Sequence, residues 1–168
     1  MNLADALPSL LPRAIAWAEA EARRAAREGE PLACDGLALA SRAGVGETER
    51  IRILVVDELP RPDDPALSDA VREAGFFPPE TIGLTLGHAV FLRGGHVSRR
   101  ALSHELRHVA QYEKAGGIAG FLPVYVRQVL EFGYAAAPLE EDARRHEADG
   151  FADSSAAALP GLFNQSNQ

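Results

Sequence analysis

Cysteine is scarce in this sequence, since Cys34 is the only one among 168 residues. A single cysteine excludes a disulfide bond within the chain, so the fold must depend on its apolar core. The chain is long enough to bury such a core and suits one domain. No motif around Cys34 marks it as an activated thiol nucleophile, which is the alternative interpretation. We therefore expect Cys34 to be a small, buried, apolar residue.

Long hydrophobic runs are also missing. No apolar stretch approaches the roughly 20 residues that a transmembrane helix needs. The first residues, MNLADALPSLLPRAIAW, contain two prolines and no basic n-region, so they are not typical of a secretory signal. These absences predict a cytoplasmic protein that does not contact a membrane.

Clusters of positive charge are missing as well. The formal net charge is −7, and the basic residues occur in short scattered pairs such as Arg23–Arg24, Arg99–Arg100 and Arg144–Arg145. Nucleic-acid binding requires clustered lysine and arginine that neutralise phosphates. We therefore expect no nucleic-acid partner and interpret the arginine pairs as solvated helix faces.

The sequence does contain helix and strand signals that predict an α+β fold, mostly helical, with a small β-sheet. An alanine-rich helix is expected over residues 9–28, with Ser9 as its cap, Pro12 in its first turn and Gly29 as its stop. Ser98 is the expected cap of a later helix. The other expected elements are a helix at 36–44, a strand at 50–56, a helix at 65–75, a strand pair or one bent strand at 81–92, and helices at 118–134 and 139–152. We expect a single domain over residues 1–152 and a flexible tail over 153–168.

The helix after Ser98 carries a metal-binding pattern, ALSHELRHVAQYEK. His104 and His108 are one helical turn apart, so their imidazoles can converge on one ion. Glu105 is rotated by about 100° from His104 around the helix axis, so it can stand beside the ion as a general base. The pattern therefore predicts a zinc site on this helix.

The opposite side of the same helix is apolar, because Leu102, Leu106 and Val109 form a core-facing stripe. A catalytic zinc site also needs a third protein ligand and an open fourth position. His88 and His96 are expected to be ordinary polar residues. The candidates for the third ligand are Glu140, Glu141, Asp142, His146 and Glu147.

The stretch HELRHVAQYE resembles the active-site helix of zincin metallopeptidases. Most of the chain resembles, more closely, an uncharacterised bacterial family of HExxH metallopeptidase-like proteins, through the segments AIAWAEAEA, IRILVVDELPRPDDPAL, GLTLGHAVF, FLPVYVRQVLEFGY and APLEEDAR. The order of the motifs is also similar to that of the gluzincins, in which a later helix supplies a ligand glutamate in an E-x-x-A setting. The resemblance implies a minimal zincin-like fold and a zinc ion held by His104, His108 and Glu140.

The local pattern around Glu140 agrees with that assignment. Pro138 favours a helix that begins nearby, and Ala143 is a small residue that lets two helices approach closely. On this helix Glu140 shares a face with Ala143, whereas Glu141 is turned away by about 100°. Glu147 is the second choice, ahead of Asp142 and His146.

The resemblance also implies a function, a zinc-dependent peptidase acting on a peptide or protein substrate. Glu105 would be the general base that takes a proton from the attacking water. An additional group usually stabilises the oxyanion, and the sequence leaves four candidates open: Tyr112, Tyr125, Tyr134 and His146. The segment GLTLGHAVFL would include an edge strand that pairs with an extended peptide, the alternative being a purely structural hairpin.

One position departs from the gluzincin pattern. Many gluzincins have an aspartate one turn after the ligand glutamate, where it orients a ligand histidine. That position is Arg144 here, and Asp142 or Glu147 could take over the role. Two other functions stay open: a binding or regulatory domain with a structural or vestigial zinc site, and a metal-free helical interaction domain.

Overall fold

The computed structural model describes residues 3–148 and 161–163. It confirms an α+β fold that is mostly helical and has a small sheet. None of the helices in these two ranges has the length and apolarity that a bilayer span requires. In chain order the elements are α1 (Leu3–Glu28), α2 (Cys34–Ala43), the 3-10 helix η1 (Thr48–Arg50), β1 (Arg52–Val56), α3 (Pro65–Glu73), β2 (Gly83–Leu86), β3 (Ala89–Arg93), α4 (Arg99–Lys114), α5 (Ile118–Phe132) and α6 (Pro138–Arg145).

The sheet has three strands in the order β1-β3-β2. Strand β3 pairs in parallel with β1 and antiparallel with β2. Residues 81–92 therefore form a strand pair rather than one bent strand. The tight turn between β2 and β3 includes Gly87, whose φ of 67° is a conformation that glycine adopts without strain. Strand β2 lies at the edge of the sheet.

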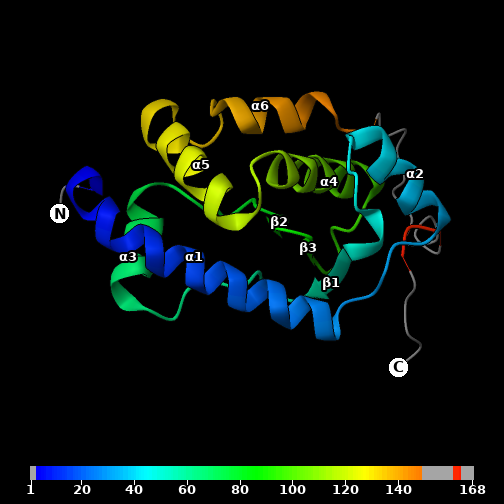
Figure 1. Ribbon diagram of the computed structural model, residues 1–168, viewed down its shortest axis with the longest axis horizontal. Helices are drawn as coiled ribbons and strands as arrows, with labels where there is room; N and C mark the ends of the chain where they lie inside the picture. Colours follow the sequence, from blue (N-terminus) through cyan, green and yellow to red (C-terminus); the bar gives the residue numbers. More distant parts are fainter. Residues whose placement is uncertain (1–2, 149–160, 164–168) are drawn as a thin grey trace.

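The sheet is covered by helices on both faces (Figure 1). Side chains alternate along a strand, so Val90 and Leu92 pack into the core formed with α4, while Ala89 and Phe91 pack with α1. All four residues are buried. This double burial explains why β3 appears in the sequence as a continuous apolar run rather than an alternating one. The expected apolar stripe of α4, formed by Leu102, Leu106 and Val109, is fully buried against this sheet.

The start of the first helix differs from the prediction. Helix α1 begins at Leu3, so Ser9 is not its cap and Pro12 lies inside it. The Ser9 hydroxyl instead donates a hydrogen bond to the carbonyl of Ala6. Proline inside a helix costs about 3 kcal/mol, because a backbone hydrogen bond is lost. Burial offsets this cost, since Leu10 packs with α3 in a separate apolar cluster.

Two other boundaries were wrong by a few residues. The strand predicted at 50–56 begins at Arg52, because Thr48–Arg50 form a 3-10 turn. The last helix ends at Arg145, where His146 leaves the helical conformation. Residues 149–152 of the predicted helix lie outside the described residues.

The predictions for Cys34 and for the tail also need correction. Cys34 is exposed as the first residue of α2, so it does not belong to the core. In the tail, Leu162 and Phe163 are buried in the main core, and Phe163 pairs with Leu32 in a short β-bridge. The expected flexible tail is therefore wrong for residues 161–163, while 153–160 and 164–168 lie outside the described residues.

We predict that Leu162→Ala lowers the free energy of unfolding by about 3 kcal/mol, because it leaves a cavity in the core. Urea denaturation followed by circular dichroism measures the change. Leu37→Ala is the matched control, because Leu37 is 38% exposed on α2 and should change stability far less. Equal effects of the two substitutions would contradict the packing of residues 161–163.

Candidate metal centre

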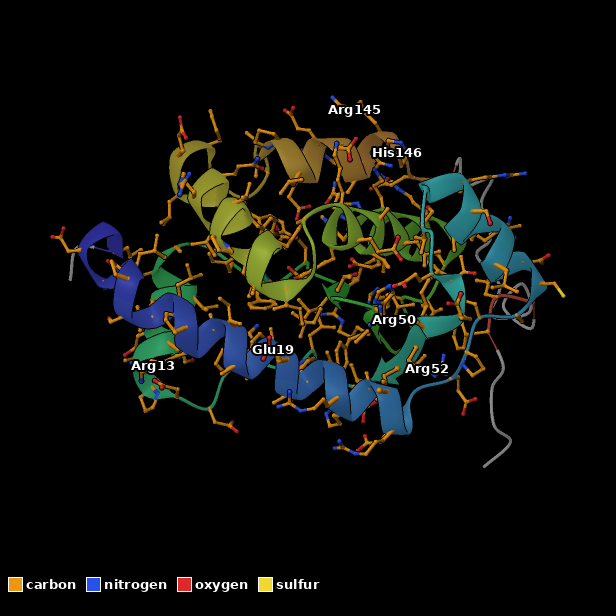
Figure 2. All side chains as sticks on the ribbon, in the orientation of Figure 1. Arg13, Glu19, Arg50, Arg52, Arg145 and His146 are labelled. Carbon is orange, nitrogen blue, oxygen red and sulfur yellow. The ribbon has the colours of Figure 1, made fainter. Side chains whose placement is uncertain are left out.

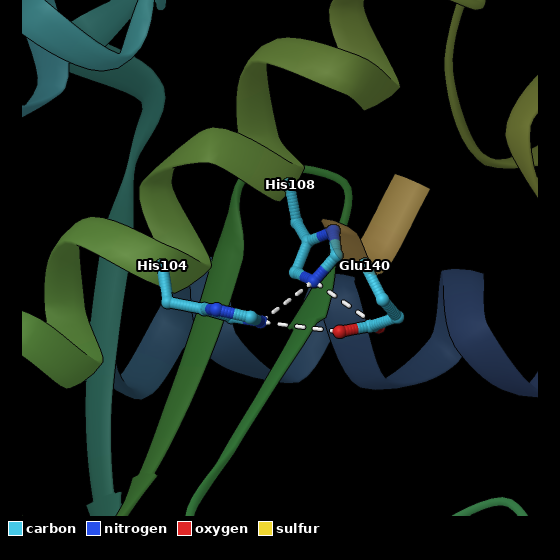
Figure 3. Close-up of side chains that lie close together, drawn as sticks. All are labelled: His104, His108 and Glu140. Carbon is cyan, nitrogen blue, oxygen red and sulfur yellow. Dashed lines mark hydrogen bonds and ion pairs between the residues drawn. The ribbon is translucent and has the colours of Figure 1, made fainter. Parts of the chain in front are cut away.

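Three side chains from two helices converge in the interior of the molecule. His104 and His108 project from α4, and Glu140 projects from α6 toward them (Figure 3). Ser98 is the N-cap of α4, as predicted, and its side chain accepts a hydrogen bond from the Ala101 N–H. Helix α6 begins with Pro138 and packs on α4, with Ala143 fully buried. The small side chain thus lies where the close approach of two helices was expected.

The spacing of the three groups matches a metal site. The Nε2 atoms of His104 and His108 are 3.2 Å apart, and each lies 3.3 Å from an oxygen of Glu140. Two ligands that bind a tetrahedral ion at 2.0–2.1 Å are separated by about 3.3–3.4 Å. The described part of the chain therefore contains a histidine–histidine–glutamate group able to hold a metal ion.

Hydrogen bonds behind the histidines orient both rings. The Nδ1 atom of His104 lies 3.0 Å from Glu147 Oε1, and Nδ1 of His108 lies 2.8 Å from Gln111 Oε1. An acceptor at Nδ1 keeps the proton there, so the Nε2 lone pair of a neutral ring faces the other ligands. Two lone pairs facing each other at 3.2 Å require a cation between them, whether a proton or a metal ion.

The electrostatics of the group agree with a cation site. Burial disfavours the charged form of His104, but the hydrogen bond to Glu140 and the negative charges of Glu105 and Glu140 outweigh it, and the pKa of His104 rises to about 9. The pKa of His108 is raised for the same reasons. Burial alone would raise the pKa of Glu140, but hydrogen bonds from both histidines hold it well below its usual range. The carboxylate is ionised although its side chain is almost completely buried.

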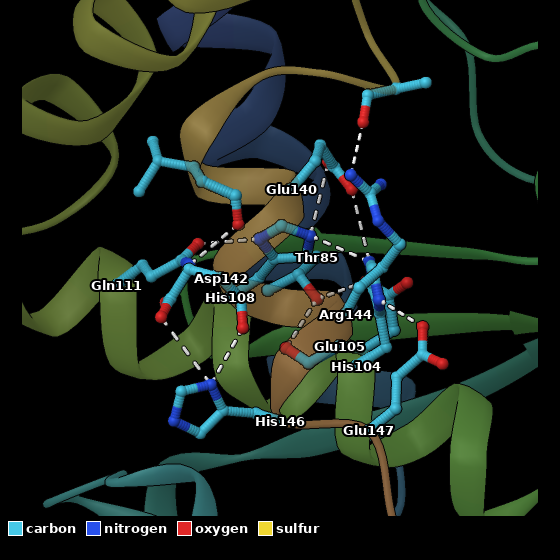
Figure 4. Close-up of polar contacts among 12 residues, drawn as sticks. Thr85, His104, Glu105, His108, Gln111, Glu140, Asp142, Arg144, His146 and Glu147 are labelled. Carbon is cyan, nitrogen blue, oxygen red and sulfur yellow. Dashed lines mark hydrogen bonds and ion pairs between the residues drawn. The ribbon is translucent and has the colours of Figure 1, made fainter.

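The outer contacts answer the question raised by Arg144. Arg144 donates to the carbonyl of Ala135 and does not contact either histidine (Figure 4). Glu147, the second choice for the third ligand, instead orients His104, and its carboxylate is paired with Arg100. Asp142 acts through Gln111, whose amide donates to Asp142 Oδ2 at 2.8 Å.

Gln111 was not singled out from the sequence. Its amide also donates to the carbonyl of Leu139 at 3.0 Å, so it links the His108 ring to the start of α6. The available signal was its position one turn after His108, which places the two side chains on the same side of α4. Glu141 is exposed and is not part of the metal group.

Glu105 lies beside the metal group and is not one of its members. Its side chain is buried, and its Oε2 accepts a hydrogen bond of 2.7 Å from the hydroxyl of Thr85 on β2. At Gly83 a Cβ atom would lie 2.3 Å from Glu105 Oε1, so glycine leaves the space that this carboxylate occupies. The edge strand therefore positions Glu105, which the sequence did not indicate.

The four candidates for oxyanion stabilisation lie in different surroundings. The Tyr125 hydroxyl donates a hydrogen bond of 2.6 Å to Glu140 Oε1. Tyr134 lines the same pocket as Tyr125, Glu105 and Glu140, and burial and the charges of Glu140 and Glu105 raise its pKa. Tyr112 is buried and stacks on Phe121. His146 lies at the end of α6 (Figure 2), where its Nδ1 donates to the carbonyl of Asp142, so it does not reach the site.

The other two histidines lie elsewhere. His96 is exposed and contacts Arg93. His88, in the turn between β2 and β3, forms a second group with Glu47 and Glu113. Both Glu113 oxygens already accept backbone N–H groups, from Gly46 and Glu47 at 2.7 and 3.0 Å. We regard this group as a structural link between the end of α4 and the segment after α2.

Comparison with known proteins adds no assignment, because no protein-family model, curated protein or solved structure matches the chain. The resemblance to zincins therefore depends on the sequence motifs alone.

We predict that the parent chain binds one zinc ion and that Glu140→Ala weakens this binding by more than 100-fold. Loss of an outer hydrogen-bond partner alone costs about 10- to 100-fold, and loss of a ligand should exceed that. Competition with a chromogenic chelator measures the affinity. Glu141→Ala is the matched control, since Glu141 is exposed on the same helix and should leave binding unchanged. Equal affinities for the two variants would exclude Glu140 as a ligand.

A second prediction concerns the outer contacts. Glu147→Ala should weaken zinc binding by about 10- to 100-fold, because His104 loses the acceptor that fixes its ring. The same chelator competition measures it, with exposed Glu131→Ala as the control. A loss as large as that of Glu140→Ala would instead identify Glu147 as a direct ligand.

Proposed function

We propose that the protein is a zinc-dependent peptidase or a related amide hydrolase. The observation that carries the proposal is the arrangement of His104, His108 and Glu140 at tetrahedral spacing beside a carboxylate, Glu105, that is not part of the group. The donor set of two imidazoles and a carboxylate suits zinc and is a combination found at catalytic zinc sites.

The number of ligands favours a catalytic over a structural site. Structural zinc sites are usually closed by four protein ligands, whereas catalytic sites have three and an open position. Among the described residues, no fourth histidine, cysteine, aspartate or glutamate joins the group. Two members of the group, His108 and Glu140, line a pocket together with Glu105. A substrate bound in this pocket would therefore lie beside the metal ion.

Glu105 is suited to the role of general base. A bound zinc ion would supply acidity to a water molecule and polarise the substrate carbonyl. Glu105 then accepts the proton as the water attacks and delivers it to the leaving amine. The hydroxyl of Thr85 donates a hydrogen bond to Glu105 Oε2 and so holds the carboxylate in place. A structural zinc site has no use for such a carboxylate.

Tyr112, Tyr125 and Tyr134 all line the pocket, and Tyr125 and Tyr134 interact with Glu140. Because the pKa values of Tyr125 and Tyr134 are raised by burial and by the charge of Glu140, both hydroxyls remain protonated and can donate hydrogen bonds. Tyr125 already donates to Glu140, so we assign the donor for the developing oxyanion to Tyr134, with Tyr112 as the alternative.

The edge strand offers a site for the substrate backbone. The N–H of Arg93 bonds to the carbonyl of Ile82, and hydrogen-bonded pairs alternate along an antiparallel ladder. The backbone groups of Gly83 and Thr85 therefore point away from β3, toward the free edge. An extended peptide can pair with this edge next to Glu105.

We predict that Glu105→Gln keeps the fold and the zinc ion but hydrolyses peptides about 100- to 10,000-fold more slowly, because an amide does not accept the proton of water. The amide oxygen can still accept the hydrogen bond of Thr85. Cleavage of a mixed pool of quenched fluorescent peptides measures the rate, and zinc content is measured in the same samples.

The control is Glu141→Gln, which makes the same chemical change on an exposed part of α6 and should retain full activity. A Glu105→Gln variant as active as the parent would refute the assignment of the base. Loss of zinc in that variant would make Glu105 a ligand or a structural support. A zinc-loaded parent that cleaves no peptide would favour a structural site.

A further inference from the structure

An apolar pocket adjoins the metal centre. It starts at Glu105, His108 and Glu140 and continues between α1, α3 and α5. Helix α1 contributes Leu7 and Leu11 to its walls, and α5 contributes Leu122 and Val126. Figure 1 shows these helices converging on one side of the sheet.

The walls of the pocket retain solvent exposure that a ligand could remove. Leu7, Leu11, Leu122 and Val126 are half-buried. Small side chains, such as Ala70 on α3, line the pocket together with the large ones. Covering half-buried apolar surface is favourable in proportion to its area, so an apolar ligand gains affinity there.

The charges around the pocket restrict the ligand. No lysine or arginine belongs to its described lining, and its only carboxylates, Glu105 and Glu140, lie at the metal centre. Away from the metal centre, a free chain-terminal carboxylate would find no lysine or arginine to pair with, and burying such a charge unpaired is costly. The pocket therefore favours a neutral group over a charged one.

The volume indicates the size of the group that the pocket can enclose. The pocket measures about 140 Å³. An apolar cavity of about 150 Å³ in another protein holds one benzene molecule. The space thus suits a single side chain such as leucine or phenylalanine.

We propose, building on the proposed function, that this pocket selects the substrate by binding one bulky, neutral, apolar side chain next to the scissile bond of an internal peptide segment. Val126 is a specificity-determining residue of this pocket. The chemistry of the metal centre and the selectivity of the pocket are separate properties, and they can be tested separately.

The first test uses straight-chain alkyl hydroxamic acids as probes of the zinc-loaded protein. Each methylene group that enters the pocket should tighten binding about fourfold. The gain in affinity should continue up to about six carbons and then stop. The monohydroxamate of succinic acid, whose chain ends in a charged carboxylate, should bind no better than acetohydroxamic acid. Isothermal titration calorimetry measures the affinities. Affinity independent of chain length would overturn the proposal, and a gain that continues to ten carbons would replace the side chain with a long acyl chain.

Two variants of α5 locate the binding. Val126→Trp should fill the pocket and remove the gain with chain length, while leaving binding of acetohydroxamic acid within about twofold. Val124→Trp is the matched control, because Val124 is 47% exposed on the same helix and should behave like the parent. A Val126→Trp variant that keeps the full gain would overturn the proposal. If this variant does not fold, the chain-length series on the parent still decides.

The second test does not depend on zinc. Trp17 is the only tryptophan and lines the pocket, so its fluorescence reports on occupancy. N-alkyl acetamides of increasing length should shift its emission in the metal-free protein, with affinities that follow the same series. Chain-length dependence without zinc binding would retain the pocket and refute the proposed function. Zinc binding without chain-length dependence would refute the pocket and leave the proposed function standing.

Discussion

The contact between the two imidazole Nε2 atoms, at 3.2 Å, is the constraint on which the metal centre depends. Two neutral rings held with their lone pairs facing each other repel, and burial removes the water that would weaken the repulsion. Only a cation between them relieves this arrangement. The ionised, buried carboxylate of Glu140 completes it, since a cation balances the cost of burying that charge.

The surrounding structure maintains this contact through one continuous set of hydrogen bonds. Gln111 joins the His108 ring to Asp142 and to the backbone of Leu139, so the orientation of a ligand on α4 and the position of α6 are coupled. Glu147 holds the other ring from the segment after α6. The hydrogen bonds that fix the position of α6, and with it Glu140, therefore also orient the two histidine rings.

The metal centre lies at the boundary between two environments. On one side are the buried ionisable groups of Glu105, His108 and Glu140, and on the other an apolar pocket whose described lining contains no lysine or arginine. A low local dielectric strengthens interactions among charges and also makes unpaired charges costly. The same boundary can therefore serve both the activation of water at the metal centre and the selection of a neutral substrate side chain in the pocket.

The sequence alone determined the features that follow from helical periodicity. It placed His104 and His108 on one face of a capped helix, Leu102 and Leu106 on the other, and Glu140 on the face of α6 that carries Ala143, because a period of 3.6 residues fixes these relations locally. Tertiary structure decided the rest. Leucine burial extended α1 through its prolines, Leu162 entered the core from the tail, and Cys34 was left exposed. The roles of Thr85 and Glu147 also depend on contacts between segments distant in the chain, for which no local pattern exists.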